Sequence, residues 1–127
     1  MKIIGIGTDI ININRISKVI KKNKLFTKRI FSNEEIKLCK KKMNIYECFA
    51  KRFAAKEAFV KALGTGFSKK LSFKEIYVKN NTEGKPTINI RGKSLKVVKN
   101  ILKKKYNILL SLSDDKPFAT AVVIITV

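Results

Sequence analysis

The stretch KRFAAKEAFVKALGTGF, residues 51–67, decides how the rest of the chain is interpreted. At 3.6 residues per turn, one face of a helix through this region carries Phe49, Phe53, Glu57, Val60 and Gly64. Four of these positions suit a buried stripe, but the other is a carboxylate. Burying an unpaired charge is costly, so we expect Glu57 to be neutralised, paired or bound to a cation.

The elements around this helix predict an α+β fold. Strands are predicted at 2–8, 71–79, 87–90, 107–113 and 118–126, and helices at about 12–22, 25–31, 32–42, 45–63 and 93–105. Ser32 and Glu35 form a capping box, and Gly64 is a helix stop. Long helices between antiparallel pairs indicate one domain over residues 1–127, in which an antiparallel sheet packs with a long central helix and shorter helices.

Composition limits the possible chemistry. The chain has 127 residues, 45% of them hydrophobic and 30% charged, which is typical of one globular domain. It contains no histidine, which excludes an imidazole base and leaves a zinc site almost without ligands. Cys39 and Cys48 do not suggest a disulfide framework, so we expect a reducing, cytoplasmic setting. No apolar run is long enough to span a bilayer, and the N-terminus is a poor signal peptide.

The formal net charge of +20 predicts attraction to polyanions. One alternative function is therefore a nucleic-acid-binding module, but the basic residues are spread over several helices without interleaved aromatic residues. Another is a membrane-surface segment at 93–105, whose apolar face we expect to belong to the core. Charge alone does not choose between nucleotides and an acidic protein, but these two observations lead us to expect no nucleic acid and no membrane as partners.

Of nine acidic residues, only Asp9 and Glu57 fall among apolar neighbours without an obvious local role. Asp9 could cap the following helix, and Glu57 could pair with Lys61 one turn away. Together they could instead hold one Mg²⁺, which commonly takes one or two protein carboxylates plus phosphates and water. Lys61 would then meet a phosphate oxygen, and Arg52 and Lys56 could reach other phosphates. Such a site suits phosphate transfer.

GIGTDI at 5–10 and RFAAKEAFVKALGTGF at 52–67 resemble the two signature motifs of the holo-acyl-carrier-protein synthases, the small group within the 4′-phosphopantetheinyl transferases. The resemblance covers essentially the whole chain and implies transfer of the phosphopantetheine arm of coenzyme A to a serine of apo acyl carrier protein. It implies that Asp9 and Glu57 bind Mg²⁺ and that Lys61 contacts the transferred phosphate. Coenzyme A contacts are implied for Arg52, Gly64 and Pro86. It also implies a homotrimer whose active sites are shared between subunits.

One departure from the family pattern lies near the C-terminus. Many members carry a histidine where this chain has Asp114, which would repel a nucleotide phosphate, and Lys116 could compensate. The proton of the attacking serine could pass to Glu57 through water, to Lys61 or to bulk solvent.

The resemblance also gives the first basic helix a function. Acyl carrier proteins are strongly acidic, so we expect Arg15, Lys18, Lys21 and Lys22 to form a docking face, with Val19 and Phe26 as apolar contacts. Each lysine could equally be part of an ordinary solvated surface. Arg15 is the stronger candidate, because only four of the 29 basic residues are arginines.

Overall fold

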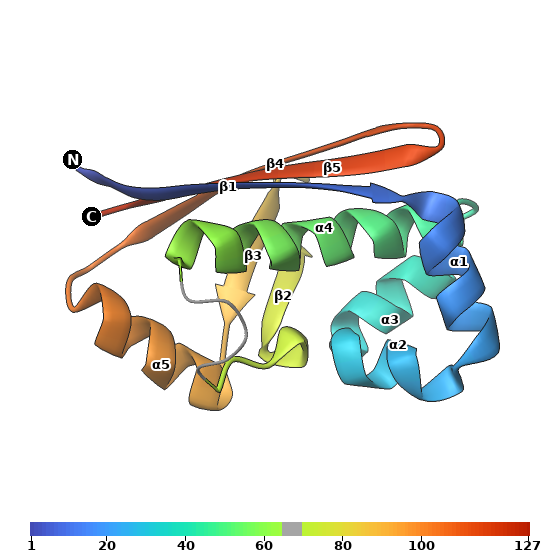
Figure 1. Cartoon of the computed structure of the whole chain (residues 1–127), viewed down its shortest axis with the longest axis horizontal. Helices are drawn as coiled ribbons and strands as arrows, with labels where there is room; N and C mark the ends of the chain where they lie inside the picture. The colour runs from blue at the N-terminus through green and yellow to red at the C-terminus, as the bar shows by residue number, and fades with distance from the viewer. Residues whose placement is uncertain (65–69) are drawn as a thin grey trace.

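The predicted order of elements is confirmed in a computed structural model that describes residues 1–64 and 70–127 (Figure 1). The strands are β1 (Ile3–Asn12), β2 (Ile76–Asn80), β3 (Pro86–Ile90), β4 (Asn107–Asp115) and β5 (Phe118–Thr126). The helices are α1 (Ile13–Lys22), α2 (Lys24–Ile30), α3 (Asn33–Lys40), α4 (Ile45–Leu63) and α5 (Gly92–Leu102), with a 3₁₀ turn, η2, at Phe73–Glu75.

Two antiparallel sheets organise the chain. One has the strand order β1-β5-β4, and the other is the β2-β3 hairpin. In Figure 1, α4 lies along one face of the larger sheet, α1, α2 and α3 gather at one end of it, and α5 lies toward the other. The α+β prediction with a long central helix is therefore confirmed, and α4 has the predicted bounds.

Two glycines bring β1 into backbone contact with α4. A Cβ atom on Gly5 would lie 1.9 Å from the carbonyl oxygen of Ala62, and one on Gly7 would lie 1.9 Å from that of Ala58. No other residue fits at either position without moving the helix away from the strand. Because side chains alternate along a strand, Asp9 continues the row of Gly5 and Gly7 and faces the same side as α4.

The outer face of the larger sheet is apolar and exposed. Ile6 and Ile10 each keep 63% of their surface exposed, and Leu109 keeps 49%. Ile4 and Val122 add to this face, at 43% and 38%. In Figure 1 no helix lies on this side of the sheet. Several large apolar side chains on this face are therefore left uncovered by the described residues.

β1 is longer than the sequence predicted and runs to Asn12 rather than ending near residue 8. Its partner β5 extends the pairing, with Asp9 opposite Ala121 and Asn12 opposite Phe118. Asn12 caps α1, its side chain accepting a hydrogen bond from the backbone of Asn14 at 2.9 Å. The alternative of Asp9 as the helix cap is therefore wrong, and its carboxylate has another use.

Smaller differences concern element ends. The predicted strand at 71–79 begins only at Ile76, because η2 precedes it. Asp114, expected in a turn, lies in β4 opposite Ala119. On α5, Val98 and Leu102 are buried in the main core, as expected for the apolar face of this helix.

Among the described residues, no helix is both long and apolar enough to cross a membrane.

Cys39 and Cys48 form a disulfide, which corrects the expectation of two unpaired cysteines. The end of α3 turns back onto the start of α4, which brings the two Cα atoms within 5.4 Å of each other. Both sulfurs lie in the smaller core cluster formed mainly by α1, α3 and α4. Closing a loop this short stabilises the fold by about 2–3 kcal/mol in the chain-entropy account.

Replacing Gly7 with alanine should destabilise the protein by about 3 kcal/mol or more, because the new methyl group meets the backbone of α4 rather than a movable side chain. Lys96→Ala is the control, because the exposed Lys96 side chain lies on α5 rather than on β1 or α4 and should cost less than about 0.5 kcal/mol. Urea unfolding of both variants measures this difference. Equal midpoints would show that the contact between β1 and α4 is dispensable.

Candidate active site

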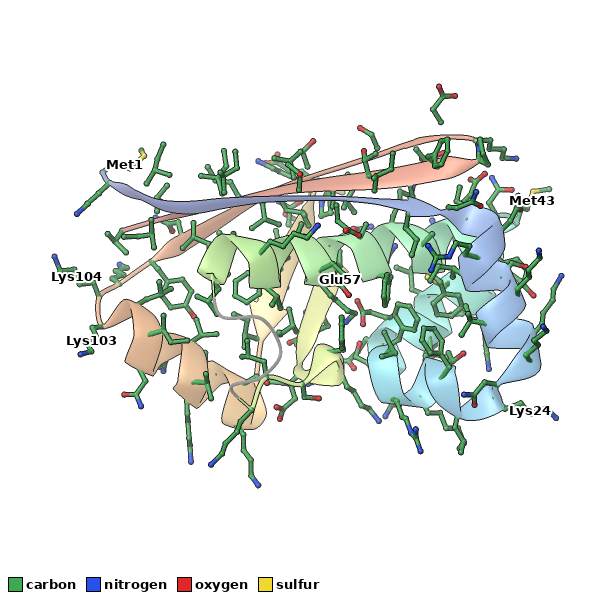
Figure 2. All side chains as sticks on the ribbon, in the orientation of Figure 1. Met1, Lys24, Met43, Glu57, Lys103 and Lys104 are labelled. Atoms are coloured by element: carbon green, nitrogen blue, oxygen red, sulfur yellow. A yellow bond between two sulfur atoms is a disulfide. The ribbon has the colours of Figure 1, made fainter. Side chains whose placement is uncertain are left out.

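Asp9 and Glu57 line one cavity of about 450 Å³ between β1, α1, α2 and α4. β1 supplies Asp9 and α4 supplies Glu57, so the backbone contact between these two elements brings the carboxylates together. Figure 2 shows Glu57 midway along α4. The full lining of the cavity is Asp9, Ile10, Ile11, Arg15, Ile16, Val19, Phe26, Phe53, Glu57 and Lys61.

Lys61 pairs with Asp9 rather than with Glu57. Its Nζ atom donates to Asp9 Oδ1 at 3.2 Å and to the backbone oxygen of Thr8 at 3.0 Å. Asp9 is only 15% exposed, whereas the Lys61 side chain is 56% exposed at the mouth of the site. The alternative of a simple Glu57–Lys61 helix pair is therefore wrong, and one ammonium group bridges the strand and the helix.

Glu57 lies in an environment that disfavours its charge. Partial burial raises the pKa of Glu57, the neighbouring Asp9 carboxylate raises it further, and Lys61 opposes both effects. The two carboxylates are therefore close enough to repel each other. A cation between them would relieve this repulsion.

The predicted docking residues divide into two groups. Arg15, Val19 and Phe26 line the same cavity as Asp9 and Glu57. Lys18 and Lys22 lie on the exposed surface of α1, outside the lining of that cavity. A protein that contacts Arg15 therefore also covers the opening above the two carboxylates.

Arg52 and Pro86 line a different cavity, of about 430 Å³. Arg52 is 6% exposed, and its Nη1 donates to both the backbone oxygen and the Sγ of Cys48 at 3.3 Å. Its Nε has no hydrogen-bond partner within residues 1–64 and 70–127, and burial lowers the pKa of Arg52. The lining consists of Lys42, Met43, Asn44, Glu47, Cys48, Lys51, Arg52, Asn80, Gly84, Pro86 and Leu112.

Lys56 lies in neither cavity, which corrects the expectation that it reaches a phosphate. Its amine is fully buried, donates to Glu35 at 2.7 Å and to the backbone of Phe73 at 2.9 Å, and also donates to the backbone of Ile76. Burial lowers the pKa of Lys56 to about 8, and Glu35 opposes this shift. Glu35 closes the predicted capping box with Ser32 as well, so one carboxylate links α3, α4 and β2.

Gly64 ends α4 in the left-handed conformation, with φ at +83°, as the sequence predicted for a helix stop. The rest of the LGTGF motif, residues 65–67, belongs to the segment 65–69 that lies outside the described residues. Gly64 lines neither of the two cavities.

Asp114 is neutralised by a residue that the sequence did not single out. Lys51 Nζ lies 3.1 Å from Asp114 Oδ1, whereas Lys116, the predicted compensating residue, pairs with Glu47 at 3.2 Å. Lys42 and Lys51 both line the Arg52 cavity. No sequence signal distinguished these two among 25 lysines.

Comparison with known protein families assigns a chain with this antiparallel sheet, long helix and carboxylate pair to one class of transferase. The chain belongs to the 4′-phosphopantetheinyl transferase superfamily, whose profile matches residues 5–123. Two relatives of nearly equal length are the holo-[acyl-carrier-protein] synthases of Pelagibacter ubique and Zymomonas mobilis. They are 49% and 48% identical over 98% and 97% of this chain, and 98% and 96% of their own.

Solved structures of holo-[acyl-carrier-protein] synthases are similar to this chain over nearly its whole length. The holo-[acyl-carrier-protein] synthase of Neisseria meningitidis superposes with a TM-score of 0.87 at 36% identity, covering 98% of this chain and 99% of its own. The synthase of Bacillus anthracis, crystallised in complex with "CoA (3',5'-ADP)", gives a TM-score of 0.79 at 38% identity, covering 98% and 97%. That of Helicobacter pylori, in complex with coenzyme A, gives 0.79 at 35%, covering 95% and 99%.

Proposed function

We propose that the Asp9–Glu57 cavity is where this enzyme modifies its carrier protein. The enzyme is a phosphopantetheinyl transferase: it moves the 4′-phosphopantetheine group of coenzyme A onto a serine of apo acyl carrier protein. The products are holo acyl carrier protein, which serves fatty acid synthesis, and adenosine 3′,5′-bisphosphate. The observation that carries the assignment of the site is the meeting of Asp9, Glu57 and Lys61 at one cavity.

The donor set fits Mg²⁺. The carboxylates of Asp9 and Glu57 are hard oxygen ligands, and their mutual repulsion favours a cation between them. Among the described residues, no three histidine, cysteine, aspartate or glutamate side chains lie close enough together to hold a metal ion. The remaining ligands of Mg²⁺ would therefore be substrate oxygens and water. When bound, Mg²⁺ neutralises charge on the pyrophosphate of coenzyme A.

The chain's own residues position the reacting groups. The serine oxygen of the carrier protein bonds to the phosphorus attached to pantetheine, the serine's proton is released to solvent, and the bond from that phosphorus to the bridging oxygen breaks. Adenosine 3′,5′-bisphosphate leaves with the bond's electron pair. Lys61, held by Asp9 and the Thr8 backbone, presents an ammonium group to the phosphate oxygens.

The Arg52 cavity supplies the second half of the site. Three cationic residues, Lys42, Lys51 and Arg52, line it together with Pro86, which suits the phosphates and adenine of coenzyme A. Because this cavity and the Asp9–Glu57 cavity share no lining residue, we propose that one coenzyme A molecule uses one cavity from each of two adjacent subunits.

The uncovered sheet face supports a homotrimer. Ile6, Ile10 and Leu109 are about half or more exposed, and a monomer would leave them in water. We propose that this face packs against the same face of two further copies, which would also bring neighbouring cavities together.

The carrier protein docks over α1 in this proposal. Arg15, Val19 and Phe26 offer one cation and two apolar groups beside the carboxylates, which matches an acidic partner whose serine must enter the cavity. Lys18 and Lys22 would then attract the acidic carrier protein at longer range.

Since both substrates are cytoplasmic molecules, we propose that the enzyme lies in the cytoplasm, and cell fractionation would test this location.

Glu57→Gln should lower the transfer rate by at least about 100-fold, because it removes one metal-binding carboxylate. The variant should be no less stable than the wild type at pH 7. Since the pKa of Glu57 is raised on folding, the unfolded state ionises first as pH rises above 4.5, and the wild type loses stability that the variant keeps.

Intact mass spectrometry of apo acyl carrier protein, coenzyme A and Mg²⁺ measures the transfer, with a chelator as the metal control. Glu83→Gln, in the exposed hairpin turn, is the matched variant and should transfer normally. Normal turnover by Glu57→Gln would contradict the assignment of Glu57 as a metal ligand. If the wild type transferred phosphopantetheine to no carrier protein, the proposed function would be wrong.

Arg15→Glu should raise the KM for acyl carrier protein about tenfold and leave the KM for coenzyme A unchanged, because it reverses a charge only at the docking face. Lys96→Glu makes the same charge change on the exposed side of α5 and should affect neither value. Equal effects of the two variants would point to net charge rather than to docking on α1.

Light scattering on the purified chain should give three times the 14.4 kDa of one chain. Ile6→Arg should reduce the assembly toward the monomer, because it places a charge in the proposed interface. A wild-type protein that stays monomeric at micromolar concentration would contradict the trimer.

A further inference from the structure

The Cys39–Cys48 disulfide lies against the one cavity in which we place the nucleotide end of coenzyme A. Cys48 is part of the lining of the Arg52 cavity, and its Sγ accepts a hydrogen bond from Arg52 Nη1 at 3.3 Å. Cys39 is completely buried and Cys48 is 5% exposed. Of the two cysteines, the slightly exposed one is therefore the one that lines the cavity.

The disulfide also joins the two ends of a wall of that cavity. Residues 41–44 connect α3 to α4, and all four are exposed. Three of them, Lys42, Met43 and Asn44, line the Arg52 cavity. The Asn44 side chain makes no cap hydrogen bond to α4, so this segment has little packing of its own. The covalent bond closes it at both ends.

Arg52 is poised to respond to this geometry. The Arg52 residue is only 6% exposed, and its Nε has no hydrogen-bond partner among the described residues. Its Nη1 donates to the backbone oxygen and to the sulfur of Cys48. An anion in the cavity would give Arg52 the partner that the protein does not supply.

We propose that Cys39 and Cys48 form a reversible thiol–disulfide pair that sets the affinity of the Arg52 cavity for the bisphosphate end of coenzyme A. Binding is tighter in the disulfide form, in which segment 41–44 is held in place. This inference rests on the proposed function for the identity of the ligand. It makes the pair positioning residues, acting through Arg52 and the cavity wall.

The chemistry is an ordinary exchange. A thiol reductant of the cell supplies two electrons and two protons, the S–S bond breaks, and Cys39 and Cys48 become thiols while two reductant thiols join as a disulfide. Disulfides in cytoplasmic proteins are uncommon and, where they occur, are usually transient or redox-sensing. In the proposed cytoplasmic setting, a reversible pair is therefore more consistent than a permanent cross-link.

The test uses the intact protein in two forms, one treated with oxidised glutathione and one with a phosphine reductant. Maleimide labelling after denaturation, read by mass, should find no free thiol in the first form and two in the second. Because coenzyme A carries a thiol of its own, the calorimetric probe is adenosine 3′,5′-bisphosphate, which has none. We expect its Kd to be about five- to tenfold weaker for the reduced protein.

Cys39→Ala is the matched variant, because it removes the bond and leaves Cys48 beside Arg52. It should bind the bisphosphate as the reduced wild type does, whichever treatment it receives. In the transfer assay, stopped with maleimide to record the thiol state, reduction should raise the KM for coenzyme A and leave kcat within about twofold. A purely structural role would instead lower kcat as folded enzyme is lost.

Two results would overturn the inference: two free thiols after oxidation, or equal Kd values for the two forms. Failure of transfer in both forms has a different meaning, because it refutes the proposed function. The Kd values of the two forms for adenosine 3′,5′-bisphosphate would still decide whether the cysteine pair sets the affinity of the Arg52 cavity. Circular dichroism confirms that both forms and the variant are folded.

Discussion

The structure depends on a backbone-to-backbone contact between β1 and α4. Gly5 and Gly7 have no side chains, so the carbonyl oxygens of Ala62 and Ala58 occupy the space that Cβ atoms would need. At this separation, the next inward residue of the strand, Asp9, lies beside Glu57 and Lys61 on the helix. The glycines of the GIGTD motif therefore determine the geometry of the carboxylate pair, although neither glycine bears a functional group.

In the proposed trimer, the directions in which α4 presents its side chains account for a site divided between two subunits. α4 presents Glu57 and Lys61 toward β1, while Arg52, little more than a turn earlier, faces the β2-β3 hairpin and lines the other cavity. A rigid helix cannot turn both sets toward one ligand of the same chain. Assembly through the exposed sheet face is the arrangement that would bring both cavities to one coenzyme A molecule.

Much of this architecture could be predicted from the sequence, because periodicity and caps are local properties. The 45–63 helix, the Ser32–Glu35 capping box and the final hairpin all follow from patterns of a few residues. The misassigned features are long-range. Lys56 and Lys61 both looked available to phosphate, but tertiary packing buries the first against Glu35 and leaves the second exposed. The disulfide likewise depends on how α3 returns onto α4.

The positions of the four arginines carry information that the net charge does not show. With 25 lysines in the chain, most positive positions require only a charge, whereas an arginine supplies several donors in a fixed plane. Arg91 uses this plane for two hydrogen bonds to Glu34, at 2.7 and 2.9 Å, and Arg52 uses it to hold Cys48 from a buried position. Arg15 lines the carboxylate cavity. Donor geometry therefore matters at two of the four arginines, Arg52 and Arg91, and two of the four, Arg15 and Arg52, lie at the two halves of the proposed site.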